Sequence, residues 1–81
     1  MRVRVRLFAS LRETVGNGEV ELEMPEGATA ESAWQQLVRE HPPLGDRRAR
    51  LTAAINRSYA TFDTPLQDGD ELVFVPPVSG G

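Results

Sequence analysis

Two short stretches that alternate between apolar and charged residues constrain the fold more than any other feature of this sequence. Residues 2–8 place three arginines and then Phe8 on one face, and residues 19–24 place three glutamates on one face. The apolar positions between them are Val3, Val5, Leu7, Val20, Leu22 and Met24. A period of two is typical of a strand with one buried face. We expect an antiparallel pair whose arginine and glutamate rows meet on the exposed side, each opposite-charge pair contributing roughly 0.2–1 kcal/mol. This pairing is favoured over a phosphate-binding role for the arginines.

One amphipathic helix is predicted after the Pro25-Glu26-Gly27 break. Thr29 is a suitable N-cap, and an acidic residue in the first turn suits the helix dipole. Apolar residues then recur at helical spacing, at Ala30, Ala33, Trp34, Leu37 and Val38. We expect Trp34 to be a core anchor rather than a ligand platform. Pro42-Pro43 should end the helix, with His41 contacting its last carbonyls rather than acting in catalysis.

The rest of the chain reads as short strands joined by turns. Residues 42–50 predict an irregular loop whose arginines, Arg47, Arg48 and Arg50, either recruit an acidic partner or are simply solvated, and solvation is favoured. The other expected elements are a helical turn at 10–13, strands at 51–55, 58–62 and 71–75, and turns at 16–18, 56–57 and 68–69.

This order of elements predicts an α+β fold, with one main helix packed on one face of a mixed sheet. The last strand should lie parallel to the first near the sheet centre. Both would then project outward-facing apolar residues onto one surface, Phe8 from the first strand and Val73 or Val75 from the last. We expect a folded domain at residues 1–75 and a flexible tail at residues 76–81.

The composition argues against several classes of function. The 81 residues contain no cysteine, one histidine and a net charge of −3. Thiolate chemistry and cysteine-ligated metals are therefore excluded, and a mildly acidic chain is a poor candidate for nucleic-acid binding. No signal peptide or membrane span is expected, which is compatible with a cytoplasmic protein. We also expect no metal site and no assembled nucleophile and base, so the chain reads as a co-substrate rather than a catalyst.

In the C-terminal Ser79-Gly80-Gly81 stretch, the candidate reactive group is the terminal carboxyl group rather than a side chain. Glycine lacks Cβ, so such a tail can enter a narrow tunnel and present its last carbonyl to another protein's active site. The six residues from Pro76 could span roughly 20 Å, and the two prolines stiffen their base. Activation by a nucleotide triphosphate would make the Gly81 carbonyl attackable, and a sulfur donor could leave a thiocarboxylate there. A frayed terminus without function is the alternative.

Several stretches, taken together in this order, resemble the ubiquitin-like β-grasp sulfur carriers, and most of all the small subunits of molybdopterin synthase. These stretches are Phe8-Ala9 followed by Arg12-Glu13, Ala54-Ile55-Asn56, Leu66 to Glu71, and Pro76-Pro77-Val78-Ser79-Gly80-Gly81. The resemblance covers essentially the whole chain, and its final stretch is the most specific part.

The resemblance implies a cycle in which the chain carries sulfur and other proteins catalyse. An E1-like adenylyltransferase would use ATP to adenylate Gly81, and a sulfurtransferase or desulfurase would supply the sulfur. The tail would then enter the catalytic large subunit of molybdopterin synthase, within a heterotetramer. There, sulfur would pass to cyclic pyranopterin monophosphate in molybdenum cofactor biosynthesis. No permanently bound cofactor is implied.

The resemblance also assigns residues. Gly81 would carry the acyl-adenylate and then the thiocarboxylate. The inserted tail would comprise Pro76, Pro77, Val78, Ser79 and Gly80. The surface that docks on partners would include Phe8, Arg12, Tyr59 and Val75.

Three other functions are compatible with the same sequence. A sulfur carrier for tRNA thiolation or thiamine biosynthesis would share the fold and the Gly-Gly chemistry. A ubiquitin-like protein modifier would use the same terminus, although the absence of lysine excludes chains built on its own lysines. A passive interaction domain would make the Gly-Gly incidental.

Overall fold

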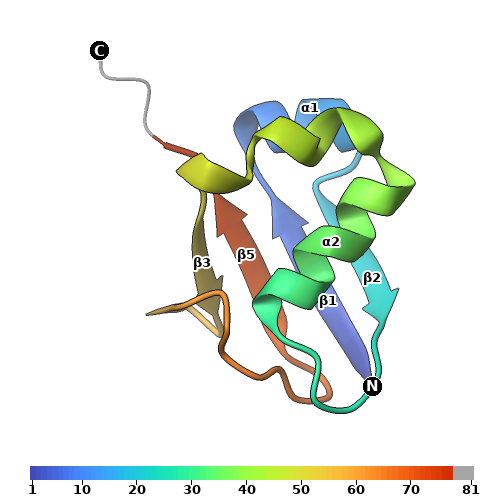
Figure 1. Ribbon diagram of the computed structural model, residues 1–81, viewed down its shortest axis with the longest axis vertical. Coiled ribbons are helices and arrows are strands. Elements are labelled where there is room, and N and C mark those ends of the chain that lie inside the picture. The colour runs from blue at the N-terminus through green and yellow to red at the C-terminus, as the bar shows by residue number, and fades with distance from the viewer. Residues whose placement is uncertain (78–81) are drawn as a thin grey trace.

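The computed structural model describes residues 1–77 and is built around a five-stranded mixed sheet in the order β2-β1-β5-β3-β4 (Figure 1). The strands are β1 (Arg2–Leu7), β2 (Glu19–Glu23), β3 (Thr52–Ile55), β4 (Ser58–Ala60) and β5 (Glu71–Val75). β1 and β5 pair in parallel, and the other neighbours pair antiparallel. The predicted α+β arrangement, with first and last strands side by side near the centre, is confirmed.

The two alternating stretches pair as expected. Arg2, Arg4 and Arg6 lie opposite Glu23, Glu21 and Glu19 in the register of β1 and β2. The intervening apolar residues of β1 are fully buried. The Arg2 guanidinium lies 3.1 Å from a Glu23 oxygen and 3.2 Å from a Glu21 oxygen. Such exposed pairs contribute little to stability, but their charges fix which face of the sheet meets water.

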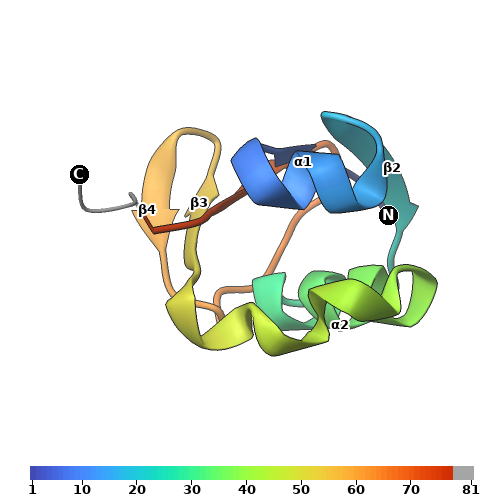
Figure 2. The ribbon, with the colours of Figure 1, turned by 90° about the horizontal axis from the view of Figure 1, so that it is seen from above.

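One helix, α2 (Ala30–Glu40), covers the other face of the sheet (Figure 2). Thr29 caps it in a reciprocal capping box, accepting from the Ser32 backbone N–H while the Ser32 hydroxyl accepts from the Thr29 N–H. At the other end, the His41 backbone N–H donates to the Leu37 carbonyl at 2.7 Å, so the main chain makes the contact predicted for His41.

The core is centred on aromatic rings under α2. Trp34 is buried and meets Phe74 of β5 edge-on, with ring centroids 5.1 Å apart, and Phe62 stacks on Phe74 with ring centroids 5.8 Å apart. The prediction that Trp34 is a core anchor is confirmed. Because Phe74 belongs to β5, this packing ties the strand that leads to the C-terminus to the helix.

The prediction of an irregular loop over residues 42–50 is wrong. This segment forms two 3₁₀ helices, η1 (Pro42–Asp46) and η2 (Arg48–Arg50). The two prolines begin η1, where their missing N–H groups cost nothing, and Leu44 is fully buried beneath it. Burial of Leu44 against the body of the domain orders a segment that its composition alone marks as loop.

The expected helical turn at 10–13 is longer than predicted. It is the helix α1 (Ala9–Val15), which ends at Gly16 in the left-handed conformation with φ of 88°. The expected strands at 51–55 and 58–62 are slightly shorter in the structure, as the bounds of β3 and β4 show.

Arg48 is not a solvated loop arginine. Its guanidinium lies 2.7 Å from a Glu31 oxygen of α2 and 3.4 Å from the centre of the Phe62 ring. A guanidinium over an aromatic face is held by the ring quadrupole as well as by the carboxylate. Arg48 therefore fastens η2 to α2 and to the aromatic core. The hydrogen bond from Arg48 is also the main reason that the pKa of Glu31 lies below its ordinary value.

Arg48→Met is expected to lower the free energy of unfolding by about 0.5–1.5 kcal/mol at pH 7, because one ion pair and one cation–π contact are lost while the aliphatic bulk remains. Since the folded-state pKa of Glu31 is depressed, the pairing stabilises the fold fully above the unfolded-state pKa and is lost as pH falls through the folded-state value. Urea unfolding should therefore show the difference between wild type and variant shrinking from pH 7 to pH 3. A difference that stays constant over this range would contradict the role given to Glu31.

Candidate functional site

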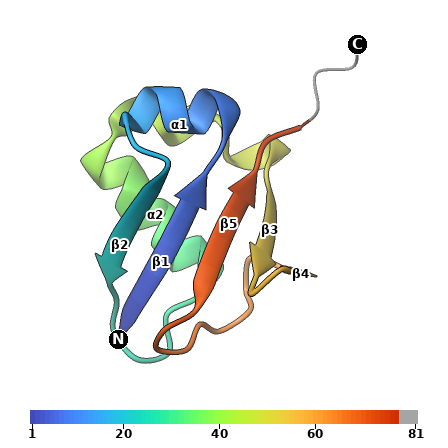
Figure 3. The ribbon, with the colours of Figure 1, turned by 180° about the vertical axis from the view of Figure 1, so that it is seen from behind.

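β5 is the central strand of the sheet, and the chain leaves the sheet at its end (Figure 3). It pairs with β1 on one side and β3 on the other, and its inward residues, Leu72 and Phe74, are fully buried. Pro76 and Pro77, here called the tail root, follow directly. The backbone that enters the tail is therefore held by hydrogen bonds to a strand on each side and by two fully buried side chains. The roles expected of Val78, Ser79, Gly80 and Gly81 concern residues outside the described part of the chain.

The outer face of the sheet divides into a charged half and an apolar half. The arginine and glutamate rows of β1 and β2 form the charged half. On the other half, Val73 of β5 is opposite Ala54 of β3, which in turn is opposite Tyr59 of β4. We call the apolar half, with Phe8 at the end of β1, the outer patch; it comprises Phe8, Ala54, Tyr59, Val73 and Val75.

The outer patch exposes two aromatic side chains. Phe8 is 46% exposed and Tyr59 is 81% exposed, and they are the large hydrophobic residues that stand most open to solvent among residues 1–77. Val73 and Val75 are half-buried between them. Exposed apolar groups that are contiguous and lie beside a chain exit suit a protein-docking surface.

Phe8 continues the exposed face of β1 and is followed by a tight turn. Ala9 has a φ of 51°, a left-handed conformation that costs a non-glycine residue about 1–2 kcal/mol. This turn ends β1 and begins α1, and the Phe8 carbonyl then accepts from the backbone N–H groups of Leu11 and Arg12. Phe8 thus stands at the junction of sheet and helix.

Arg12 lies one helical turn from Phe8, exposed on α1, with its side chain passing close to Gly18. The four predicted docking residues therefore do not all lie on one face of the fold. Phe8, Val75 and Tyr59 lie on the sheet, and Arg12 extends the surface onto α1. Sequence reasoning left Ala54 out, although its place between Val73 and Tyr59 follows from the strand register.

The sequence motif around residues 66–71 has a structural role in the described chain. The Asp70 carboxylate accepts from the Asn56 side-chain amide at 2.8 Å and from the Gln67 backbone N–H at 2.7 Å. Asn56 in turn accepts from the Glu71 N–H at 3.0 Å. Asp70 is buried, and its contacts join the β3–β4 turn to the start of β5. The acidic residues of this motif position the strand that carries the tail root.

Asp70→Ala is expected to lower the free energy of unfolding by about 1–3 kcal/mol, because two donors in a buried turn lose their acceptor. Asp70→Asn retains one acceptor oxygen and should cost less. Chemical denaturation of both variants at pH 7 measures the difference. If Asp70→Ala were as stable as wild type, water would replace the carboxylate at no cost, and Asp70 would have no structural role.

The described residues were searched for side chains that could together hold a metal ion. That part of the chain holds no cluster of three or more histidine, cysteine, aspartate or glutamate residues that could bind a metal ion. None of its helices is long and apolar enough to cross a membrane. What the described residues do provide is an exposed apolar surface beside the tail root.

Comparison with known proteins places this geometry in a family. The model of the ThiS family matches residues 5–81. The molybdopterin synthase sulfur carrier subunit of Escherichia coli is 39% identical over 98% of this chain and 99% of its own length. That of Arabidopsis thaliana is 37% identical over 100% of this chain and 84% of its own length. The crystal structure of SAMP1 from Haloferax volcanii superposes with a TM-score of 0.90 at 31% identity, covering 100% of both chains.

These matches span the sheet, the helices and the residues beyond the tail root, and the solved relative has the same ubiquitin-like β-grasp fold. The chain belongs to the ThiS family and, within it, to the molybdopterin synthase sulfur carrier subunits.

Proposed function

We propose that this chain carries sulfur to the dithiolene of molybdopterin on the carboxyl group of Gly81. The observation that supports this most strongly is whole-length similarity to sulfur carrier subunits, in a match that runs through residue 81. The fold supports it independently, because β5 anchors the tail root beside an exposed apolar surface.

Activation is needed because a carboxylate is a poor electrophile at neutral pH. In the proposed first step, a carboxylate oxygen of Gly81 attacks the α-phosphorus of ATP in an E1-like adenylyltransferase, and pyrophosphate leaves. A hydrosulfide equivalent from a sulfurtransferase or desulfurase then attacks the carbonyl carbon, and AMP leaves. The product is a Gly81 thiocarboxylate, whose ionised sulfur is a strong nucleophile.

Delivery requires a second protein that supplies the catalytic groups. In the proposed step, the outer patch docks on the large subunit of molybdopterin synthase, and residues 76–81 enter its active site. Sulfur passes to cyclic pyranopterin monophosphate, and water restores the Gly81 carboxylate. Two such rounds supply the two sulfur atoms of the dithiolene.

Reconstitution tests this function. Chain thiocarboxylated at Gly81, mixed with the large subunit and cyclic pyranopterin monophosphate, should form molybdopterin, whereas unmodified chain should form none. If the thiocarboxylated chain binds the large subunit but no molybdopterin forms, the acceptor must be sought in tRNA thiolation or thiamine biosynthesis.

The outer patch gives a prediction that is independent of the chemistry. Tyr59→Ala is expected to weaken binding to the large subunit by about tenfold or more, because tyrosines that become buried on binding are frequent interface hot spots. The melting temperature should stay near that of wild type, since Tyr59 is 81% exposed. Titration calorimetry measures the affinity, and Arg57→Ala, in the neighbouring turn, is the matched control. Equal affinities for wild type and Tyr59→Ala would remove Tyr59 from the interface.

A protein modifier is the second candidate, and the likeness to a small archaeal modifier protein of Haloferax volcanii, 33% identical over 94% of this chain, favours it. The same acyl-adenylate would then be attacked by a lysine amine of another protein. Cell extract incubated with the chain, its adenylyltransferase and ATP should give a ladder of covalent adducts if the chain is a modifier. The sulfur-carrier proposal predicts no such ladder.

A further inference from the structure

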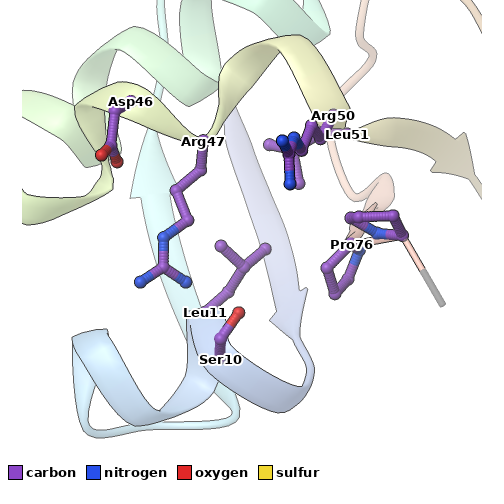
Figure 4. Close-up of a pocket in the computed structure, with 8 residues that line it drawn as sticks. Ser10, Leu11, Asp46, Arg47, Arg50, Leu51 and Pro76 are labelled. Carbon is purple, nitrogen blue, oxygen red and sulfur yellow. The ribbon is translucent and has the colours of Figure 1, made fainter. Parts of the chain in front are cut away.

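A groove of about 460 Å³ lies beside the tail root, between α1 and the η1–η2 segment (Figure 4). Pro76 and Pro77 form one wall, and Leu11 of α1 lies in the base. Arg47 and Arg50, from the η1–η2 segment, line the groove as well. Three segments far apart in the sequence thus meet where the chain leaves the sheet.

The two arginines place two positive charges in the groove beside the tail root. No carboxylate oxygen among residues 1–77 lies within 4.0 Å of the guanidinium of Arg47 or Arg50, although Asp46 lines the same groove. The neighbouring Arg48 differs, because Glu31 and Phe62 already hold it. Within the described part of the chain, Arg47 and Arg50 therefore have no carboxylate partner, and their guanidinium groups can meet an external anion.

Any protein that takes the tail into a tunnel must place the mouth of that tunnel around the tail root. The groove and the outer patch then both lie beside this mouth. We propose that Arg47 and Arg50 bind carboxylates on the rim of the tail channel of the adenylating enzyme. This inference rests on the proposed function and adds to it a recognition site and the chemistry of its partner.

The adenylating enzyme is favoured over the large subunit because of the kind of contact each of these two surfaces offers. An apolar surface with exposed aromatic rings suits a stable complex with the large subunit. Charge complementarity mainly raises association rates and specificity, which suits an enzyme that must bind and release a carrier in every cycle. The groove lined by Arg47 and Arg50 offers charged rather than apolar contacts, so we assign it to the partner that binds transiently.

The test is ATP–pyrophosphate exchange catalysed by the cognate adenylyltransferase, with the chain as variable substrate. Arg47→Glu/Arg50→Glu should raise the KM for the chain by about tenfold or more at low salt, because attraction becomes repulsion. The kcat should change less than twofold, since Gly81 and the tail are untouched. Arg47→Lys/Arg50→Lys keeps both charges and should stay near wild type. Raising the salt concentration should reduce the difference in KM between wild type and the double glutamate variant, because salt screens the charges.

A matched control separates this site from general charge effects. Arg57 is exposed in the β3–β4 turn, next to the end of β3 that pairs with the start of β5, away from the tail root. Arg57→Glu should leave the KM unchanged, whereas the single change Arg50→Glu should raise it. Binding of the double variant to the large subunit, and its melting temperature, should match wild type.

Three results would overturn the inference: an unchanged KM in the double glutamate variant, an equal rise in Arg57→Glu, or an equal loss of binding to the large subunit. The last would assign the arginines to a rim shared by both partners. A wild-type chain that supports no exchange would instead overturn the proposed function itself, so the two failures are distinguishable.

Discussion

Deletion of Gly81 is expected to abolish sulfur transfer while leaving the fold intact. Without this residue, the terminal carbonyl falls short by one residue, about 3.3–3.6 Å, in any channel that positions it for attack. A misplacement of even about 1 Å in a reacting group can cost a hundredfold in rate. Molybdopterin formation should therefore drop below detection, while the melting temperature stays within about 1–2 °C of wild type, because a ΔΔG of a few tenths of a kcal/mol is all that a terminal residue contributes.

A chain ending in a Gly81 carboxamide is the sharper control, because it keeps every residue and removes only the ionisable oxygen. It should bind the adenylyltransferase and the large subunit as wild type does but never become adenylated. Substantial transfer from either variant would show that the reactive group lies elsewhere. A large fall in melting temperature on deletion would mean that the end of the chain is structural.

Trp34→Ala is expected to destabilise the domain by about 3–5 kcal/mol, the largest loss that one core substitution should cause here. Trp34 is buried against Phe74, the inward residue of β5 that precedes the tail root by two positions. A domain of this size has a total stability of roughly 4–12 kcal/mol, so much of it would be lost. Thermal unfolding followed by circular dichroism should show a fall of at least about 12 °C.

Trp34→Phe is the matched control, since it keeps an aromatic ring against Phe74 and should lose much less stability. Partly unfolded Trp34→Ala should also transfer sulfur poorly, because the strand that presents the tail is no longer fixed. Near-wild-type stability of Trp34→Ala would contradict the assignment of this ring to the centre of the core.

The strands and the main helix could be predicted because their signals are local. The alternation of Val3, Val5 and Leu7 with arginines leaves only one way to bury one face, and the glutamates of residues 19–23 supply the matching row. Thr29 marks the start of α2 by its side-chain chemistry alone. The density of β-forming residues predicted the strand at 71–75, and the order of elements predicted that this strand lies beside the first one.

The η1–η2 segment and the groove beside it could not be predicted, because they depend on tertiary contacts. Two prolines and several arginines look like a loop, and only the burial of Leu44 makes the segment helical. Arg47 and Arg50 are about thirty residues from Pro76 in the sequence, so no local pattern joins them. The expected strand order placed Val73 or Val75 on the exposed face, and the family resemblance added Tyr59, but neither argument reveals which partner these residues contact.

Intact mass spectrometry tests the central claim most directly. The chain is incubated with its adenylyltransferase, ATP and a sulfur source, and fragment ions locate any change. If the chain carries sulfur on Gly81, the mass should rise by the difference between one sulfur and one oxygen atom, and the rise should map to Gly81. An unchanged mass, in a reaction where the same enzyme thiocarboxylates another carrier, would contradict this claim.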